Sequence, residues 1–354
     1  MTKATDTIEI RRPDDWHLHV RDGRAMQDVI VHTAAQFARA IIMPNLKPPV
    51  VSAQDAIAYR QRILAALPKE GVASQFQPLM TLYLTDNTPA DEVARAKEAG
   101  VIGFKLYPAG ATTNSDAGVT DIRRCDAVLA QMEKLDVPLL VHGEVTHSEI
   151  DVFDREAIFI EKILEPLRQR HPGLRIVFEH ITTKQAVEYV RDADTQRFAK
   201  IAATVTPQHL LYNRNSIFSG GLRTHYYCLP VLKREEHRQA IVNIVASGNS
   251  RFFLGTDSAP HPKGAKESAC GCAGCYTAWH AMSLYAEVFE QAGALDKLEG
   301  FASIYGPEFY GLPLNQGTLK LRRQTIQIPA EFPFGDEVVV PLRAGETTQW
   351  ALVE

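Results

Sequence analysis

The feature that most constrains the fold is an alternation of short apolar runs with longer amphipathic stretches along most of the chain. The stretches 53–67, 90–100 and 120–135 have the apolar spacing typical of helices. Parallel neighbouring strands need long crossover connections, so this alternation predicts one parallel sheet. The runs expected to form its strands are 15–20, 39–44, 76–84, 101–107, 137–142, 174–180, 200–206 and 251–257.

Eight such β/α units predict an α/β protein with a (β/α)8 barrel of the TIM type. The chain has 354 residues, of which 45% are hydrophobic, enough for a large core. A doubly wound open sheet is the alternative, but no glycine-rich phosphate-binding motif follows the first expected strand. Helical periodicity ends near residue 312, and the later "DEVVVPL" (336–342) indicates strands. We therefore expect a single domain over 1–354, with a small C-terminal β extension from about 312 to 354 packed on the barrel.

Composition limits the classes of partner and the cellular compartment that we expect for this chain. The 42 acidic and 38 basic residues give a net charge of −4 without a dense basic block, so no nucleic-acid partner is expected. No apolar run approaches the roughly 18 residues that span a bilayer, and the polar start "MTKATDTIEI" is unlike a signal peptide, so no membrane partner is expected. Five cysteines, an odd number, do not resemble a disulfide framework and favour the cytoplasm.

Metal-capable and ionisable residues fall where the expected strands end. His17 and His19 stand two residues apart, so on a strand they point to the same face. The carboxyl ends of barrel strands form the mouth where active sites of this fold lie. Taken singly, each residue has a plainer reading, such as a buried histidine bonded to the backbone or a turn aspartate. The other residues at such positions are Asn45, Lys105, His142, His180 and Asp257, and together the metal-capable ones favour a metal site.

Four histidines and an aspartate suit divalent ions such as zinc. Five ligands are too many for one tetrahedral catalytic ion that keeps an open position, so two ions are expected. No glutamate stands at a bridging position, whereas Lys105 is the only charge in "VIGFKLYP" (101–108). A neutral lysine amine can add carbon dioxide, and burial beside two dications disfavours the ammonium form. The resulting carbamate could bridge the two ions.

Seven short motifs stand out along the chain: "DDWHLHVRDG" (14–23), "MPNLKPP" (43–49), "GFKLYPAGATTNS" (103–115), "VHGE" (141–144), "FEH" (178–180), "YCLPVLK" (227–233) and "GTDSAPH" (255–261). Together they resemble the amidohydrolase superfamily and, within it, the dihydroorotases of the single-function bacterial type. The resemblance covers about residues 8–312. It implies a homodimeric hydrolase of pyrimidine biosynthesis that reversibly cyclises N-carbamoyl-L-aspartate to L-dihydroorotate.

The resemblance also implies roles for individual residues. One zinc ion would be held by His17, His19 and Asp257, the other by His142 and His180, with N6-carboxylated Lys105 as the bridge. A hydroxide bridging the metals would attack the ring amide carbonyl. Asp257 would be the general base and acid. The implied substrate-binding residues are His19, Arg21, Asn45, Thr112, Thr113, His142, Leu229, His261 and Ala273, with Leu229 and Ala273 contributing backbone groups.

Arg21 has support from the residues themselves. It continues the spacing of His17 and His19, so it faces the same way if the strand persists, and its planar fork suits a carboxylate. A solvated charge or a pairing with Asp22 is the alternative. The segment 108–118 could be a lid hinged near Gly110 and Gly118, or a surface loop without ligand contact.

Other functions remain open from the sequence. A hydantoinase-like cyclic amidohydrolase would share the metals but not the carboxylate clamp. A mononuclear deaminase would not need Lys105, and a non-catalytic barrel scaffold would not need the ligands. The motif "CGCAGC" (270–275) could form a separate zinc or redox site, although a closed structural zinc site normally has four ligands.

Overall fold

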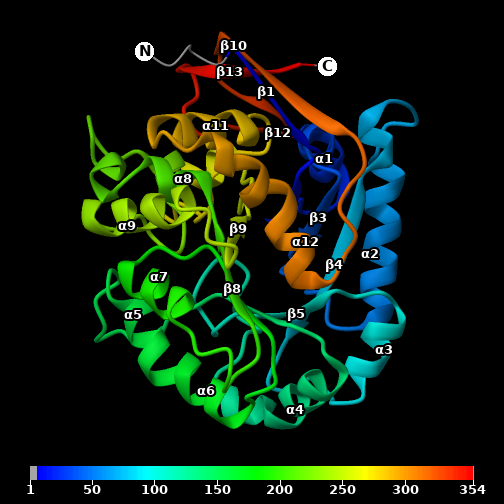
Figure 1. Cartoon of the computed structure of the whole chain (residues 1–354). Coiled ribbons are helices and arrows are strands. Elements are labelled where there is room, and N and C mark those ends of the chain that lie inside the picture. Colours follow the sequence, from blue (N-terminus) through cyan, green and yellow to red (C-terminus); the bar gives the residue numbers. More distant parts are fainter. Residues whose placement is uncertain (1–5, 354) are drawn as a thin grey trace.

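A computed structural model of the chain describes residues 6–353 and contains a central barrel of eight parallel strands, numbered β2 to β9 in the order in which they pair (Figure 1). A backbone hydrogen bond from Asp257 to His17 and a bridge between Leu18 and Ser258 join the last strand region to the first. The predicted barrel is confirmed. The strands are β2 (Asp14–Leu18), β3 (Arg39–Ile42), β4 (Gln77–Leu84), β5 (Gly103–Leu106), β6 (Leu139–Val141), β7 (Ile176–Phe178), β8 (Ile201–Val205) and β9 (Phe252–Leu254).

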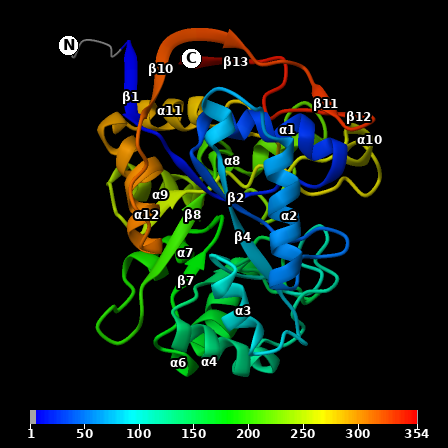
Figure 2. The ribbon, with the colours of Figure 1, turned by 90° about the vertical axis from the view of Figure 1, so that its right-hand side faces the viewer.

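Helices surround these strands, and Figure 2 shows α2 alongside β4. The strands read as near-continuous apolar runs because helices cover their outer faces while side chains fill the barrel interior. The helices are α1 (Gly23–Gln36), α2 (Ala53–Ala66), α3 (Glu92–Glu98), α4 (Asp126–Leu135), α5 (Arg155–Phe159), α6 (Glu165–Arg170), α7 (Lys184–Arg191), α8 (Pro207–Leu211), α9 (Glu235–Ala246), α10 (Lys263–Lys266), α11 (Ala281–Gln291) and α12 (Tyr305–Tyr310).

The amino-terminal end of the barrel is closed by aromatic packing. Trp16 is fully buried on β2 and stacks on Tyr310 of α12 with ring centroids 4.6 Å apart. Phe253 packs edge-on against the same tryptophan. A Cβ at Gly306 would lie 1.9 Å from Trp16 Nε1, so only glycine allows α12 to approach this closely. Because this end is filled, the opposite end is the one available for a site.

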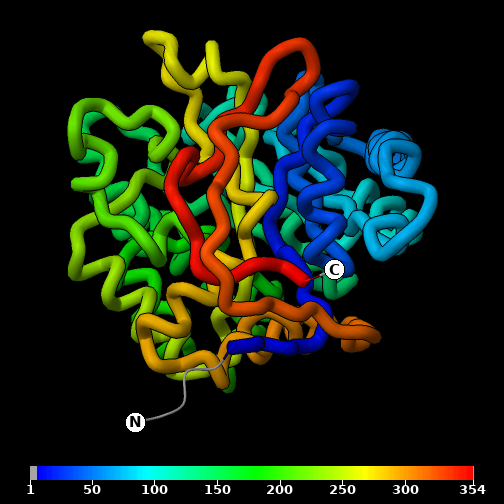
Figure 3. Tube along the Cα trace, turned by 90° about the horizontal axis from the view of Figure 1, so that it is seen from above, coloured from blue at the N-terminus to red at the C-terminus, as the bar shows by residue number. Residues whose placement is uncertain are grey.

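A second, antiparallel sheet lies outside the barrel and combines both ends of the chain. It contains β1 (Thr7–Arg11), β10 (Thr318–Gln327) and β13 (Thr347–Val353), and β11 (Phe332–Phe334) pairs with β12 (Glu337–Val339). Figure 3 shows this C-terminal segment crossing the molecule in orange and red, with β1 in blue beside it. Strands were expected after residue 312, but the contribution of β1 was not.

Two local expectations need correction. The first barrel strand ends at Leu18, and Arg21 has a φ of 62°, so the strand alternation does not extend to Arg21. The stretch 120–135 is not one helix but a 3₁₀ turn, Ile122–Cys125, followed by α4. Asp121 caps that turn by accepting a hydrogen bond from the Arg123 amide. None of the helices in residues 6–353 combines the length and apolarity needed to cross a bilayer.

Candidate active site

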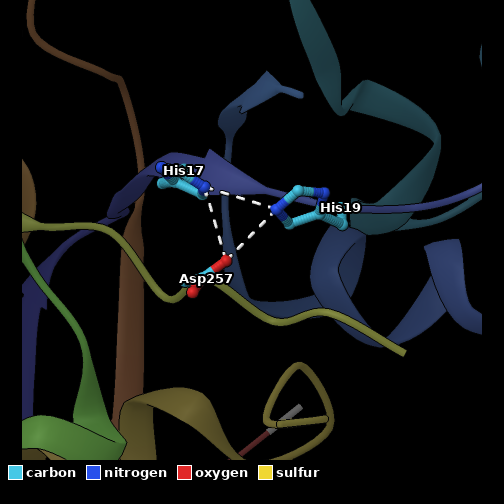
Figure 4. Close-up of side chains that lie close together, drawn as sticks. All are labelled: His17, His19 and Asp257. Carbon is cyan, nitrogen blue, oxygen red and sulfur yellow. Dashed lines mark hydrogen bonds and ion pairs between the residues drawn. The ribbon is translucent and has the colours of Figure 1, made fainter. Parts of the chain in front are cut away.

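Three potential metal ligands converge at the carboxyl ends of β2 and β9. His17 Nε2 and His19 Nε2 lie 3.4 Å apart, and they lie 3.4 and 3.2 Å, respectively, from Asp257 Oδ1 (Figure 4). Ligands of one tetrahedral zinc ion with bonds of about 2.0–2.1 Å stand roughly 3.3 Å apart. These three atoms therefore have the spacing of ligands that share an ion.

His142 and His180, which follow β6 and β7, continue this cluster. The ring centroids are 4.8 Å apart between His142 and His180 and 4.9 Å apart between His180 and His17. His180 and Asp257 have positive φ angles of 40° and 44°, a region that non-glycine residues rarely adopt. Such strained residues concentrate at functional sites, where the surrounding structure holds them in place.

Lys105 lies on β5 beneath the histidines and is completely buried. Its amine contacts the carboxylate of Glu179 and lies 4.8 Å from the Tyr107 ring centre. Glu179 also lies 2.9 Å from His17 Nδ1, measured from Oε1. The sequence indicated no glutamate at a bridging position, but it did not anticipate a glutamate in contact with both Lys105 and His17. Glu179 belongs to a second group, with His17 and His180, whose ligand atoms are close enough to hold an ion.

The protonation states suit metal binding. Burial lowers the pKa of His19 to about 4 and also lowers the pKa values of His142 and His180. Although burial opposes it, contacts with His17 and His19 hold the pKa of Asp257 well below its usual value. Neutral imidazoles and an ionised carboxylate are the forms that bind metals. The donor set therefore fits divalent ions.

His17 differs from the other three histidines, because Glu179 lies beside it and beside Lys105. Although burial opposes it, the Glu179 charge raises the pKa of His17. Burial lowers the pKa of Lys105, although the charge of Glu179 opposes this shift. The lowered pKa favours the neutral amine that carbamate formation requires.

A cationic side chain faces the same pocket from the other side. Arg21 Nη2 lies 2.9 Å from His261 Nε2, and Arg21 Nε donates a 2.8 Å hydrogen bond to the Pro260 carbonyl. Burial and the adjacent arginine lower the pKa of His261 to about 2, so the imidazole is neutral. Neither contact neutralises the guanidinium, which leaves its charge available to an anion.

The loop 108–118 reaches across the mouth of the barrel. Asn45 Nδ2 donates a 3.1 Å hydrogen bond to the Thr113 carbonyl, and Asn114 Nδ2 donates one of 3.0 Å to the Asn45 carbonyl. The Thr113 hydroxyl lies 3.4 Å from the Ala273 carbonyl. Together these parts of the chain surround a narrow pocket of about 20 Å³, lined by His17, His19, Arg21, Asn45, Tyr107, Thr112, Thr113, His142, His180, Leu229, Asp257, Ala259, Ala273 and Gly274.

The structure thus brings together the residues that the sequence singled out. Lys105 lies below the pocket and His261 adjoins it through Arg21. The sequence reading missed Glu179, Glu144 and Tyr107. Glu144 Oε2 lies 2.9 Å from His142 Nε2, and the buried Tyr107 hydroxyl has no hydrogen-bond partner within the described part of the chain. Lys105 was identified as a charged residue within an apolar run near the end of a strand. The same signal could have identified both glutamates.

The cysteines of 270–275 are placed differently from one another. Cys270 is exposed and its sulfur lies 3.9 Å from that of Cys272, whereas Cys275 is buried. Within residues 6–353, the groups with metal-ligand geometry include none of these thiols.

Comparison with known proteins agrees with this architecture. The amidohydrolase family pattern matches residues 14–323. A dihydroorotase of Cupriavidus pinatubonensis is 65% identical over 98% of this chain and 99% of its own length. The crystal structure of a dihydroorotase from Campylobacter jejuni, 35% identical, covers 100% of this chain and 99% of its own with a TM-score of 0.89. An L-hydantoinase from Arthrobacter aurescens, 14% identical, covers 98% of this chain and 83% of its own with a TM-score of 0.79, which shows the shared fold alone. The chain belongs to the amidohydrolase family and, within it, to the dihydroorotases.

Proposed function

We propose that the protein catalyses the reversible cyclisation of N-carbamoyl-L-aspartate to L-dihydroorotate, a step of pyrimidine biosynthesis. The observation that carries this proposal is one pocket containing both the metal-ligand cluster around Asp257 and the uncompensated cation of Arg21. The first suits hydrolysis or formation of an amide, and the second suits a substrate with a carboxylate beside that amide. The near-complete similarity to proteins named dihydroorotase supports the same reaction.

We assign the metal-holding roles as follows. His17, His19 and Asp257 would hold one ion, His142 and His180 would hold the other, and carboxylated Lys105 would bridge them. The nitrogen-rich ligand set suits zinc. Bound divalent ions would supply Lewis-acid polarisation of the amide carbonyl and a lower pKa for water. The spacing of the His17, His19 and Asp257 atoms supports the first of these assignments.

Arg21, Asn45 and His261 would bind the substrate carboxylate. The planar guanidinium can donate two parallel hydrogen bonds to such a group. Its contacts with His261 and the Pro260 carbonyl hold that fork in one orientation before the substrate arrives. Backbone groups of Leu229 and Ala273 would bind the ring amides, and Thr112 and Thr113 would contact the ligand from the loop above the pocket.

Asp257 would move the proton. Its carboxylate is ionised, lines the pocket and lies against His17 and His19. In hydrolysis it would accept the proton of the attacking water and deliver it to the leaving amide nitrogen, and in cyclisation it would act in reverse. The loop 108–118, which contacts Asn45 and Ala273 across the mouth, would limit the access of bulk water to this transfer.

The decisive experiment follows absorbance at the dihydroorotate band with purified, metal-replete protein and each substrate in turn. Conversion is expected in both directions, and none in either would overturn the proposal. Ring closure consumes a proton because a carboxylate becomes a neutral amide, so lower pH favours dihydroorotate. An equilibrium that stays flat between about pH 6 and 8, where carboxylates are ionised, would also contradict it.

A hydantoinase-like activity is the alternative within the same fold. Hydantoin and dihydrouracil contain the cyclic amide but no carboxylate, so they give Arg21 nothing to bind. We expect negligible turnover of either compound under conditions in which dihydroorotate is hydrolysed. Comparable turnover of all three would favour the alternative.

We also propose that the enzyme is a cytoplasmic homodimer. The five free thiols support a reducing compartment. The dimer rests on the family resemblance, and the mass of the purified protein by sedimentation tests it.

A further inference from the structure

Glu144 occupies a position that the proposed reaction does not use. It follows His142 by two residues, and its Oε2 lies 2.9 Å from His142 Nε2. Both side chains are buried. An imidazole has two ring nitrogens, so an Nε2–H donated to Glu144 leaves Nδ1 as the nitrogen whose lone pair can bind a metal.

Glu144 is separated from the substrate pocket. It is not among the residues that line the pocket with Arg21 and Asp257. It instead borders a neighbouring cavity of about 440 Å³ together with Thr146 and Phe159. Among the proposed metal ligands, the one that Glu144 contacts is His142.

The local backbone fixes this pair. A Cβ at Gly143 would lie 2.0 Å from Phe178 Cε2, so only glycine lets the segment pack this closely against β7. The charges of Lys233 and Arg155 help to lower the pKa of the Glu144 carboxyl, although burial opposes them. Lys233 is itself buried and donates a 3.0 Å hydrogen bond to the Val231 carbonyl. A buried anion with cations nearby is a stable partner for one ring orientation.

The other ligand proposed for the same ion differs. His180 Nδ1 is buried and has no hydrogen-bond partner in the described residues. His17, on the other side of the centre, has a carboxylate nearby: Glu179 Oε1 lies 2.9 Å from its Nδ1, although neither atom makes a hydrogen bond within the described residues. Loss of Glu144 would therefore weaken one half of the centre and leave the His17 half supported.

We propose that Glu144 is a positioning residue: it holds His142 in the Nε2–H tautomer and presents Nδ1 to the ion shared with His180. Carboxylates that accept the second N–H of a ligating histidine fix its ring and increase its basicity, and their removal commonly weakens metal binding 10–100-fold, by an order-of-magnitude rule. This inference rests on the two-ion centre of the proposed function.

The test measures metal retention by Glu144→Ala and Glu144→Gln during stepwise competition with a chelator. Glu144→Ala should bind one of two ions about 10–100-fold more weakly and the other as in the wild type. Glu144→Gln keeps an acceptor oxygen and should lose less. The control is Glu287→Gln, which changes a buried glutamate that bonds Arg343, Thr348 and Gln349 elsewhere in the molecule. It should retain both ions.

Four results would overturn the proposal. Both ions held with wild-type affinity in both Glu144 variants would exclude a positioning role. Equally weaker binding of both ions would indicate a general loss of packing. A fall in the melting temperature of the metal-free variants that parallels the loss of metal affinity would indicate the same. A wild-type protein with fewer than two ions would overturn this inference and the proposed centre together. Two ions without dihydroorotate turnover would instead contradict only the proposed reaction.

Discussion

Arg21 is the residue that should separate this enzyme from other cyclic amidohydrolases. Replacing it with methionine keeps an unbranched side chain but removes the charge and the forked donors. Each hydrogen bond to a charged group contributes about 1.5–3 kcal/mol, so two lost bonds predict at least a roughly 100-fold fall in kcat/KM for dihydroorotate. Steady-state kinetics measures this, and metal content should stay at the wild-type level.

Arg24→Met is the matched control, because Arg24 pairs with Asp336 at the surface. Its kinetics should equal those of the wild type. Full activity in Arg21→Met would contradict the carboxylate clamp without affecting the metal assignments.

His280 gives a prediction for stability against pH. Burial, with the nearby charge of Arg343, lowers its pKa to about 3 in the folded protein. In the unfolded chain the pKa of His280 is near 6.5, so below that pH the unfolded state binds a proton that the folded state does not. The free energy of unfolding therefore decreases as the pH falls from about 6.5 towards 3. His280→Gln should flatten the pH dependence by up to about 1.4 kcal/mol per pH unit in that window.

Urea unfolding at several pH values between 4 and 8 measures the difference between the wild type and His280→Gln. His147→Gln, at an exposed position, is the control for the substitution itself. Parallel curves for the wild type and His280→Gln would show that His280 does not titrate differently on unfolding.

At the scale of elements, the barrel strands could be predicted because burial on both faces produces short continuous apolar runs. β6, β7 and β9 are buried throughout and coincide with such runs. The pairing of β1 with β10 could not be predicted, because it joins residues more than 300 positions apart. Its alternating pattern, exposed then buried, is short and fits an exposed loop equally well.

The candidate site divides in the same way. His17, His19 and Asp257 could be predicted because each follows from strand position alone. Arg21 reaches the pocket through a left-handed backbone conformation and through contacts with Pro260 and His261. The two-residue spacing of a strand predicts neither of these. Glu179 was missed because "FEH" (178–180) indicates His180 as its functional residue. Strand alternation would also place the side chains of Glu179 and His180 on opposite faces.

The loop 108–118 supplies a prediction about an element. A Cβ at Gly118 would lie 2.4 Å from the Tyr107 carbonyl oxygen and 2.9 Å from that of Ser115, so Gly118→Ala must displace the loop. Because Thr113 crosses the mouth from this loop, KM should rise several-fold while both ions are retained. Steady-state kinetics and metal analysis measure the two effects.

Gly71→Ala is the comparison for this variant, since Gly71 has a positive φ of 80° but open space around its Cβ, and it lies away from the pocket. It should alter stability rather than KM. An unchanged KM in Gly118→Ala would show that the position of the loop does not matter for substrate binding.

At the scale of the whole molecule, the two ends of the barrel have separate tasks. Trp16 and α12 fill one end with apolar contacts, whereas the other end concentrates buried polar groups that no core interaction requires. Burying polar groups without partners costs free energy. The fold therefore carries a destabilising site, which bound ions would offset.

Metal removal tests this balance for the whole protein. Ligands that bind only the folded state stabilise it, by about 4 kcal/mol at a thousandfold excess over Kd. For a chain of this size that corresponds to a fall in Tm of roughly 5–10 °C after the ions are removed by a chelator, with recovery when zinc is restored. Calorimetry, together with elemental analysis of each sample, measures it. A chelated sample with no residual metal but an unchanged Tm and full turnover would contradict the proposed metal centre, because the convergent histidines would then be stable and active without ions.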